Sequence, residues 1–412
     1  MTENYLMLHQ KFGIQFLKDK PRCLLADEAG LGKSRQVLEA AKSFVKGRNM
    51  LVLCPTSVVE NWKEECRKWG FPEDKFVVCG YEYQFLHHFE ALKKRRWGVI
   101  VADECQMLRN WAAQRTKLFR DLIKGRDSKI WLLSGTPMMK GAMDLHPLLS
   151  FIEPGVHGKY GEFCEKFCNK KPDQWSPNGF RWDGVKNGKI LNAILDKVML
   201  RRYKKDEVDD LPDKIISKIP VVLPSSHFDV FTNSGIVRAI SEAVIRGGTS
   251  DPELIETLQQ LGLKKVDHVV KFVTDILHPH PTVIFAHHRT VLYDIAEKLR
   301  EKGRKVEVLI GGMDKNKRHE YVKQFQSGSL DDLVVGIGVG GVGINLFRSS
   351  RCVFAEFPWT YAALDQASDR LHRIGQKDCV NAYWVVAKNT FEEAMLKVIE
   401  DRKDMTEEVV GV

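Results

Sequence analysis

The chain has 412 residues, of which 43% are hydrophobic and 28% charged, enough apolar material for two or three globular cores. No apolar run reaches the roughly 18 residues of a membrane span, and the first residues lack the basic and then apolar layout of a secretory signal. These features exclude a membrane-spanning or secreted protein, and we expect a soluble intracellular one.

The net charge of +9 is unevenly distributed along the chain. Residues 1–150 carry 25 Lys and Arg against 17 Asp and Glu, whereas residues 151–412 carry 38 against 37. A basic half suits a polyanionic partner such as nucleic acid, although a solvated surface can carry such an excess without binding anything.

The nine cysteines are an odd number, and Cys164 and Cys168 are the only close pair, with His157 nearby. Their spacing occurs in zinc sites, but no second pair follows at a suitable distance. The pattern therefore favours ordinary cysteines on a helix face and a reducing, intracellular setting.

Short apolar runs recur in both halves, each followed at once by polar and glycine residues. Amphipathic helical patterns lie between many of them, as at 35–44 and 290–302. The runs are residues 23–26, 51–54, 99–102, 130–133, 283–286, 333–335 and 352–355. Strands that alternate with helices predict parallel α/β sheets, in which ligands gather at the carboxyl ends of the strands.

The strand rhythm fades between about residues 145 and 280. Residues 171–190 are rich in Gly, Pro and Asn and are typical of an irregular insertion, whereas 226–278 has a mainly helical pattern. Leu211-Pro212-Asp213 breaks the chain, as a hinge between lobes does. The predicted organisation is a first lobe over 1–200 with a helical insertion at about 145–200, a linker over 201–225, and a second lobe over 226–412, which begins with a helical insertion and ends with a bracing helix over 391–408.

The first polar motif, residues 27–34, follows a strand and precedes a helix, as a phosphate-binding loop requires. Gly30 and Gly32 would let backbone N–H groups approach phosphate. Lys33 would reach the β and γ phosphates of ATP, and the Ser34 hydroxyl would hold Mg²⁺. Asp27 stands where the strict pattern has its first glycine, so a turn that binds nothing is the alternative.

The second motif, Asp103-Glu104, ends the apolar run 99–102. A carboxylate at a buried strand end is costly to desolvate unless it has a partner. Asp103 would hold the Mg²⁺ shell, and Glu104 would orient or deprotonate the attacking water. Adjacent carboxylates also occur as simple helix caps, but the two motifs in this order favour a nucleotide hydrolase.

In order, the sequence contains DEAGLGKS, CPTSVVENW, DECQ, LSGTP, VIFAHH, GGVGINL and QASDRLHRIGQ. This order resembles helicase superfamily two, specifically the Swi/Snf family of DNA-translocating ATPases, over about residues 5–395. The HRIGQ ending and the MLRR–LP stretch are its most specific signals. FAHH, the FRWDG insertion and MLRRYKKDEVDDLP look most like the HARP-type annealing helicases, whose separate HARP module has no counterpart in this sequence.

The resemblance implies roles for further residues of the first lobe. Gln10 would contact adenine, although it could equally be a polar residue of the first helix. Pro55 and Thr56 would meet a DNA phosphate, and the Ser134-Gly135-Thr136 turn would couple the nucleotide state to the DNA grip. Either segment could also be only a turn.

In the second lobe, the resemblance places Gly343 at ATP, and Gly341 and Asn345 at DNA. The sequence departs from the family just upstream, because Ile337 replaces the Thr or Ser that commonly precedes the glycines. A hydroxyl contact to the DNA backbone is therefore missing or supplied elsewhere. Glycine-rich turns are usually only turns, so this motif has modest weight by itself.

Gln366, Arg370 and Arg373 have a spacing of four and then three residues, which predicts one helix face. The resemblance implies that Gln366 binds the nucleotide and that the two guanidinium groups act on the γ-phosphate as arginine fingers. Isolated surface arginines would more often be solvated charges. Asp369 could pair with one of these arginines, and His372 is expected to be structural.

The resulting expectation is an α/β protein of two tandem RecA-like lobes with helical insertions. It would hydrolyse ATP with Mg²⁺ at the cleft between the lobes and, as a monomer, move along double-stranded or branched DNA. Its backbone contacts would make that motion independent of sequence. A strand-separating DNA or RNA helicase and a non-enzymatic nucleic-acid clamp are the alternatives.

Overall fold

The computed structural model describes residues 5–173, 176, 178–208, 211–224, 231–340, 344–373 and 375–411. The chain forms two compact units, which we call unit 1 (residues 1–209 and 404–412) and unit 2 (residues 210–403). The division falls inside the predicted linker, 201–225. The last nine residues cluster with unit 1, although we expected them in the second lobe.

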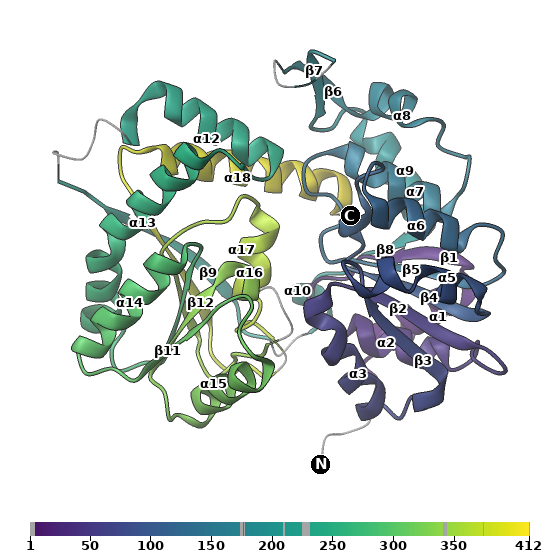
Figure 1. Ribbon diagram of the computed structural model, residues 1–412, viewed down its shortest axis with the longest axis horizontal. Helices are drawn as coiled ribbons and strands as arrows, with labels where there is room; N and C mark the ends of the chain where they lie inside the picture. The colour runs from purple at the N-terminus through teal and green to yellow at the C-terminus, as the bar shows by residue number, and fades with distance from the viewer. Residues whose placement is uncertain are drawn as a thin grey trace. The chain divides into compact units, whose positions relative to one another are not determined.

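Unit 1 contains a six-stranded parallel sheet in the order β3-β2-β4-β5-β1-β8 (Figure 1). Its strands are β1 Arg22–Leu25, β2 Asn49–Cys54, β3 Phe76–Gly80, β4 Trp97–Asp103, β5 Lys129–Leu133 and β8 Met199–Leu200. Both faces of the sheet are covered, since Leu51 and Leu53 of β2 enter one hydrophobic core while Met50 and Val52 enter another. Burial on both faces explains why these strands are continuous apolar runs rather than alternating ones.

Helices connect these strands. They are α1 Leu8–Asp19, α2 Lys33–Ala41, α3 Val59–Lys68, α4 Gln84–His87, α5 Phe89–Lys94, α6 Gln114–Ile123 and α10 Lys204–Glu207, with the 3-10 turns η1 Thr56–Val58, η2 Glu73–Lys75, η3 Cys105–Leu108 and η4 Ala142–Asp144. Strands β1, β2, β4 and β5 each end at a loop or turn that carries one of the polar motifs.

The predicted insertion contains α7 Leu145–Ile152, α8 Tyr160–Phe167, β6 Asn169–Pro172, β7 Phe180–Asp183 and α9 Gly188–Val198. β6 and β7 form an antiparallel hairpin within the stretch that we expected to be irregular. Cys164 of α8 and Cys168, which follows the end of that helix, are both buried in the core of unit 1. Val409 and Val410 enter the same core, and Asn192 of α9 donates to the carbonyl of Val409.

Unit 2 contains a second six-stranded parallel sheet, in the order β11-β12-β10-β13-β14-β9. Its strands are β9 Lys214–Val221, β10 Thr282–Ala286, β11 Val306–Leu309, β12 Asp332–Gly336, β13 Arg351–Phe354 and β14 Val380–Ala387. β9 lies in the segment that we predicted to be a linker, but it pairs with β14 along its whole length. The prediction of an α/β protein with two parallel sheets is confirmed.

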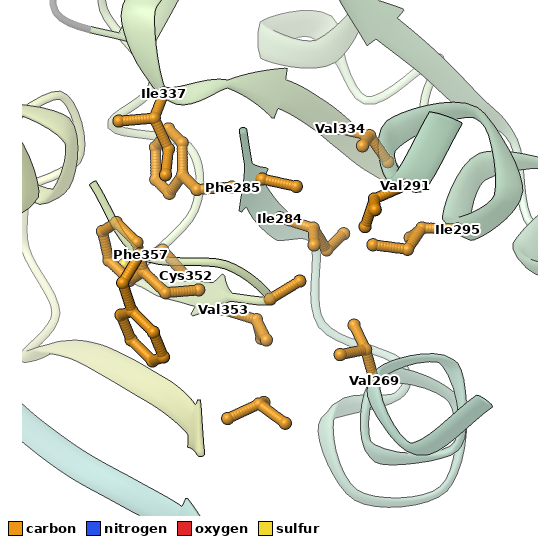
Figure 2. Close-up of a cluster of buried hydrophobic side chains, with 14 of the residues drawn as sticks. Val269, Ile284, Phe285, Val291, Ile295, Val334, Ile337, Cys352, Val353 and Phe357 are labelled. Atoms are coloured by element: carbon orange, nitrogen blue, oxygen red, sulfur yellow. The ribbon is translucent and has the colours of Figure 1, made fainter. Parts of the chain in front are cut away.

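The helices of unit 2 are α12 Ser234–Arg246, α13 Pro252–Lys271, α14 Arg289–Glu301, α15 Lys315–Ser327, α16 Ile337–Gly340, α17 Tyr361–Ser368 and α18 Phe391–Val410, and Phe272–Leu277 continues α13 as a π-helix. Figure 2 shows Val269 of α13 and Val291 and Ile295 of α14 beside the core side chains Ile284 and Val334. Phe391, Met395, Leu396 and Ile399 of α18 are buried in this core. No helix among the described residues is long and apolar enough to cross a membrane.

Candidate nucleotide site

The loop between β1 and α2 has the backbone shape of an anion cradle. Gly30 and Gly32 have left-handed φ angles of 99° and 75°, which glycine adopts without steric cost. A Cβ atom at Gly32 would lie 2.6 Å from Nε2 of Gln10, so the Gln10 amide would have to move to admit a side chain there. No described side chain caps the N-terminus of α2, and its backbone N–H groups therefore suit an anionic ligand.

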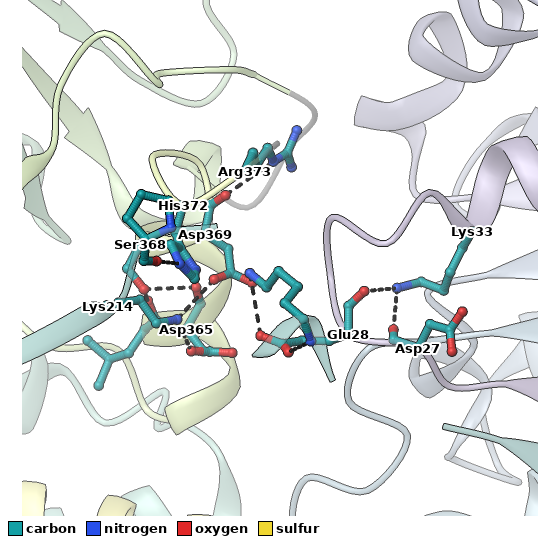
Figure 3. Close-up of polar contacts among 12 residues, drawn as sticks. Asp27, Glu28, Lys33, Lys214, Asp365, Ser368, Asp369, His372 and Arg373 are labelled. Carbon is teal, nitrogen blue, oxygen red and sulfur yellow. Dashed lines mark hydrogen bonds and ion pairs between the residues drawn. The ribbon is translucent and has the colours of Figure 1, made fainter. Parts of the chain in front are cut away.

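Lys33 begins α2 and turns back into the loop (Figure 3). Its Nζ donates to the carbonyl oxygens of Asp27 at 2.6 Å and Glu28 at 3.3 Å. Burial lowers the pKa of Lys33, while the charges of Glu104 and the neighbouring aspartates oppose that shift. The loop carbonyls thus accept the hydrogen bonds of the ammonium, and the oxygens of a bound phosphate could replace them as acceptors.

Asp27, which departs from the strict loop pattern, is fully buried. Its two carboxylate oxygens accept from Nε and Nη2 of Arg202, at 3.0 and 2.6 Å. Gln36 of α2 donates to the same carboxylate at 3.1 Å. The carboxylate therefore points into a satisfied buried network instead of toward the ligand side of the loop, which explains why the missing glycine is tolerated.

Residues 201–204 form hydrogen bonds with the nucleotide loop and with the Ser134 turn, and the sequence reasoning missed these contacts. Arg201 donates to the carbonyls of Ala26 at 3.1 Å and Gly135 at 3.0 Å, and the backbone N–H of Lys204 donates to Glu28 at 2.7 Å. The only signal for this contact was the MLRR stretch, which marked the family but suggested no role.

Asp103 and Glu104 lie at the carboxyl end of β4, in unit 1 with the loop. Asp103 accepts from Nε1 of Trp62 at 2.8 Å and from the backbone N–H of Glu104 at 3.0 Å. Burial and then the charge of Glu104 raise the pKa of Asp103 to about 6. Glu104 has a left-handed backbone, with φ 49° and ψ 50°, a strained conformation of the kind that gathers at functional sites.

A chain of hydrogen bonds joins Glu104 to the Ser134-Gly135-Thr136 turn. Gln106 donates to the Glu104 carboxylate at 2.6 Å, and Ser134 donates to the Gln106 side-chain oxygen at 2.7 Å. A Cβ atom at Gly135 would lie 3.8 Å from Nζ of Lys33. The turn is therefore hydrogen-bonded to the carboxylate through Gln106 and lies beside the lysine of the candidate site.

Pro55 and Thr56 follow β2, at the start of η1. The hydroxyl of Thr56 donates to the carboxylate of Glu82, and its backbone N–H donates to the same oxygen at 3.1 Å. The sequence reasoning missed Glu82. Its carboxylate accepts from the two groups that we expected to meet a DNA phosphate, so a phosphate would have to replace it.

In unit 2, the prediction that Gln366, Arg370 and Arg373 share one helix face is wrong. α17 carries Gln366 but ends at Ser368, and both arginines lie in the turns that follow. The backbone N–H of Arg370 donates to Ala367, so the helical pattern has tightened at this point. Periodicity alone could not reveal this end, because apolar and polar residues keep helical spacing across it.

Arg373 contacts Asn345, another predicted site residue. Its Nη1 donates to Oδ1 of Asn345 at 2.9 Å, and its Nε donates to the carbonyl of Asp369 at 3.1 Å. Arg370 is buried, and its carbonyl accepts from the backbone N–H of Leu346. Gly341 and Gly343 lie outside the described residues. Ile337, the departure from the family pattern, is buried at the start of α16.

The turns after α17 carry Arg370 and Arg373, and we call them the arginine turn. Ion pairs join this segment and the end of α17 to strand β9 (Figure 3). Nζ of Lys214 lies 2.6 Å from Oδ1 of Asp365 and 2.9 Å from Oδ1 of Asp369. Burial lowers the pKa of Arg373, and the charge of Asp369 opposes that shift, so Asp369 acts on Lys214 and on one of the two arginines. The ring of His372 bonds to the carbonyl of Pro212 at 2.6 Å, which agrees with a structural role.

Comparison with family models decides the relationship. The SNF2-related domain matches residues 9–81 and 70–266, and the helicase conserved C-terminal domain matches residues 264–375. The chain belongs to the SNF2-related family. As an SNF2-related chain it is a helicase-like ATPase core, and the resemblance inferred from its motifs is confirmed.

Several curated proteins are similar to this SNF2-related chain. The SWI/SNF-related matrix-associated actin-dependent regulator of chromatin subfamily A-like protein 1 homolog of Caenorhabditis elegans is 30% identical, over 98% of this chain and 62% of its own length. The protein of that name from Xenopus tropicalis is 29% identical, over 96% and 44%. The human DNA annealing helicase and endonuclease ZRANB3 is 26% identical, over 97% and 40%. The chain thus spans less than two thirds of each relative.

Among solved structures, the Sulfolobus solfataricus SWI2/SNF2 ATPase core in complex with dsDNA is similar to the SNF2-related chain. It is 24% identical, with a TM-score of 0.43, and the match covers 98% of this chain and 93% of that one. The core without DNA in its description gives a TM-score of 0.42 at the same identity.

The residues of unit 1 fit ATP and Mg²⁺. The loop offers backbone N–H groups and one ammonium for phosphate, and Gln10 lies against Gly32. Ser34 and Asp103 supply the oxygen donors that Mg²⁺ prefers, and the hydrogen bonds of Asp103 leave it acidic enough to ionise near neutral pH.

Proposed function

We propose that this SNF2-related chain is an ATP-dependent double-stranded DNA translocase. The observation that carries the proposal is the site in unit 1, where Lys33 is held by the nucleotide loop and Glu104 is hydrogen-bonded through Gln106 to the Ser134 turn. Family membership supports the ATPase assignment.

Each group has a distinct task in the proposed hydrolysis. Lys33 and the backbone N–H groups at the start of α2 bind the β and γ phosphates. Ser34 and Asp103 hold Mg²⁺, which when bound would neutralise phosphate charge. Glu104 orients or deprotonates the attacking water, and Gln106 fixes its carboxylate at a 2.6 Å hydrogen bond. Gln10 contacts the adenine.

Arg370 and Arg373 complete the chemistry in this proposal. A guanidinium fork suits the charge that develops on the transferred phosphoryl group. Gln366 and Gly343 contact the nucleotide in this proposal, and Asn345 contacts DNA. Because one set of groups belongs to unit 1 and the other to unit 2, hydrolysis requires both units to act on one ATP. Loss of the γ-phosphate then releases that arrangement.

Movement on DNA follows from two grips that change with the nucleotide state. Pro55 and Thr56 in unit 1, with Gly341 and Asn345 in unit 2, each hold backbone phosphates rather than base edges. The relatives named annealing helicases support a finer proposal, that the substrate is branched DNA whose strands are reannealed.

ATP turnover in the presence of blunt duplex, forked duplex, single-stranded DNA and RNA tests this function. We expect duplex-containing DNA to stimulate turnover most, and Lys33→Ala to abolish it. Displacement of a third strand from a triplex, without separation of the duplex itself, would identify translocation. Separation of duplex strands would instead support a conventional helicase, and equal nucleic-acid effects in wild type and Lys33→Ala would support a passive clamp.

A further inference from the structure

A cavity of about 1050 Å³ opens in unit 1 between residues 106–120 and 140–160, which belong to η3, α6, η4, α7 and α8 and the loops beside them. Among its 15 described lining residues, Asp144 is the one acidic residue and six are basic. The six are Arg109, Arg115, Lys117, Arg120, Lys140 and Lys159. Apart from Gln106, the proposed hydrolysis uses none of these lining residues.

The carboxylate of Asp144 does little to neutralise this lining. Its Oδ2 accepts from the backbone N–H groups of Met139 at 2.9 Å and Lys140 at 2.7 Å, and the side chain is nearly fully buried. Arg109 faces its other oxygen at 3.9 Å. Six basic side chains against one carboxylate leave the lining with an excess of positive charge, which attracts a polyanion.

The aromatic wall of the cavity is already engaged. Trp111 donates from Nε1 to Nδ1 of His146 at 2.9 Å, and the guanidinium of Arg120 lies 5.5 Å from its ring centroid. Nε of Arg115 donates to the carbonyl of Met107 at 2.9 Å, which fixes the direction of that guanidinium. The wall thus presents oriented charge rather than an open ring for base stacking, and it favours a backbone over a base.

We propose that this cavity binds the phosphodiester backbone of one nucleic-acid strand, at a site separate from the grip at Pro55 and Thr56. A strand carries a phosphate every 3.4 Å or so, so several cations of one cavity can each meet a phosphate of the same strand, whereas the carboxylates of a folded protein are scattered. Arginine forks also suit phosphate geometry. The assignment rests on the proposed function only in taking DNA as the partner.

Gln106 connects the cavity to hydrolysis. It lines the cavity, and its Nε2 donates to the carboxylate of Glu104 at 2.6 Å. A strand phosphate that accepts a hydrogen bond from Nε2 of Gln106 competes with the Glu104 carboxylate for that donor, and so moves Glu104. The site therefore reports strand occupancy to the group that activates water, and it deepens the proposed DNA-dependent activity.

The test compares two charge-matched double variants of the full chain. Lys117→Glu with Lys159→Glu reverses two exposed cations of the cavity, and Lys46→Glu with Lys124→Glu reverses two exposed cations of unit 1 outside its lining. Binding without nucleotide is measured by fluorescence anisotropy across a salt series. The probes are a labelled blunt duplex and the same duplex with a single-stranded tail.

For the cavity variant we expect about tenfold weaker binding and a salt slope smaller by about 1.4 on the tailed probe, since each lost single-strand phosphate contact removes about 0.7. The control pair should change the slope less than half as much. An equal loss on the blunt duplex would identify the strand as one of a duplex, and a loss confined to the tailed probe would identify a free strand.

Two results would overturn the proposal. One is a cavity variant whose affinity and salt slope match those of the control pair on both probes. The other is weakened binding of a labelled polyglutamate peptide with unchanged DNA binding, which would assign the cavity to an acidic protein segment. Either result leaves the proposed function intact if wild-type ATP turnover still responds to DNA. Conversely, the absence of turnover would overturn the function without affecting these binding measurements.

Discussion

Arg202 holds Asp27 through two hydrogen bonds between its guanidinium fork and a fully buried carboxylate. The pair joins the start of the nucleotide loop to a segment far along the chain, with Gln36 as a third partner. A residue that breaks the loop pattern is therefore part of the support that fixes the loop.

Asp27→Gly, which restores the strict loop glycine, should destabilise the protein. The change leaves the Arg202 guanidinium buried beside an empty acceptor position, and loss of one partner of a buried pair costs about 3–5 kcal/mol. Chemical denaturation of the variant, and ATP affinity by equilibrium binding, measure the effect.

The matched control for this prediction is Arg67→Ala, which breaks the exposed pair with Glu73 and should change stability by less than about 1 kcal/mol. The double variant Asp27→Gly with Arg202→Met removes both charges and should be more stable than Asp27→Gly alone. Equal stability of Asp27→Gly and wild type would contradict the assigned role.

Gln106→Leu should lower ATP turnover without weakening ATP binding. Its side chain holds the Glu104 carboxylate and accepts from Ser134, so its loss frees the general base. We expect roughly a tenfold decrease in kcat, against about 10²–10⁴-fold for Glu104→Gln, which removes the base itself. Steady-state turnover and binding of a fluorescent ATP analogue separate the two effects, and a rise in KM with kcat unchanged would argue against positioning.

The stability of unit 1 should fall on mild acidification because of His146. Burial lowers the pKa of His146, and its Nδ1 must stay unprotonated to accept from Trp111. A folded pKa below the unfolded value, about 6.5, contributes stability above that pH and loses it as the pH falls.

The change is limited to about 1.4 kcal/mol per pH unit for one proton. Denaturation curves at pH 7.5 and 5 should show a smaller loss for His146→Asn, which can still accept from Trp111 but does not titrate. An identical loss in the variant and wild type would assign the pH dependence to other groups.

Lys214→Met should impair hydrolysis from outside the arginine turn. Asp369 is 1% exposed, and without Lys214 its carboxylate loses an ion pair beside Arg370 and Arg373, so the turn should lose its fixed position. We expect lower kcat at unchanged ATP affinity. Lys218→Met, on the same strand but in an exposed pair with Glu400, is the control and should retain wild-type turnover.

The parallel sheets could be predicted because strands buried on both faces leave a plain apolar signal, as in residues 51–54 and 283–286. Strand β9 was not predicted, because it is an edge strand with several exposed side chains and it follows a proline break. The hairpin of β6 and β7 was not predicted for the same reason, since β6 is entirely exposed. Edge strands depend on a partner strand, which local sequence does not reveal.

Some residues of the candidate site could also be predicted from the sequence, and others could not. Lys33, Asp103 and Glu104 could be found because each follows a strand at a motif of fixed spacing. Arg202 and Glu82 could not, because their roles arise from contacts between segments distant in sequence. The turn that follows α17 contacts Lys214 through Asp369 and Pro212 through His372, and both partners come from a segment distant in sequence.

In the proposed mechanism, Arg370 and Arg373 act on the ATP held by Lys33. The decisive measurement is ATP turnover by Arg370→Ala and Arg373→Ala under saturating duplex DNA, with ATP affinity measured in parallel and the exposed Arg238→Ala as control. We predict that each variant loses about 10³–10⁵-fold in kcat while binding ATP within a few-fold of wild type. Turnover by both variants at the rate of the Arg238→Ala control would contradict the account.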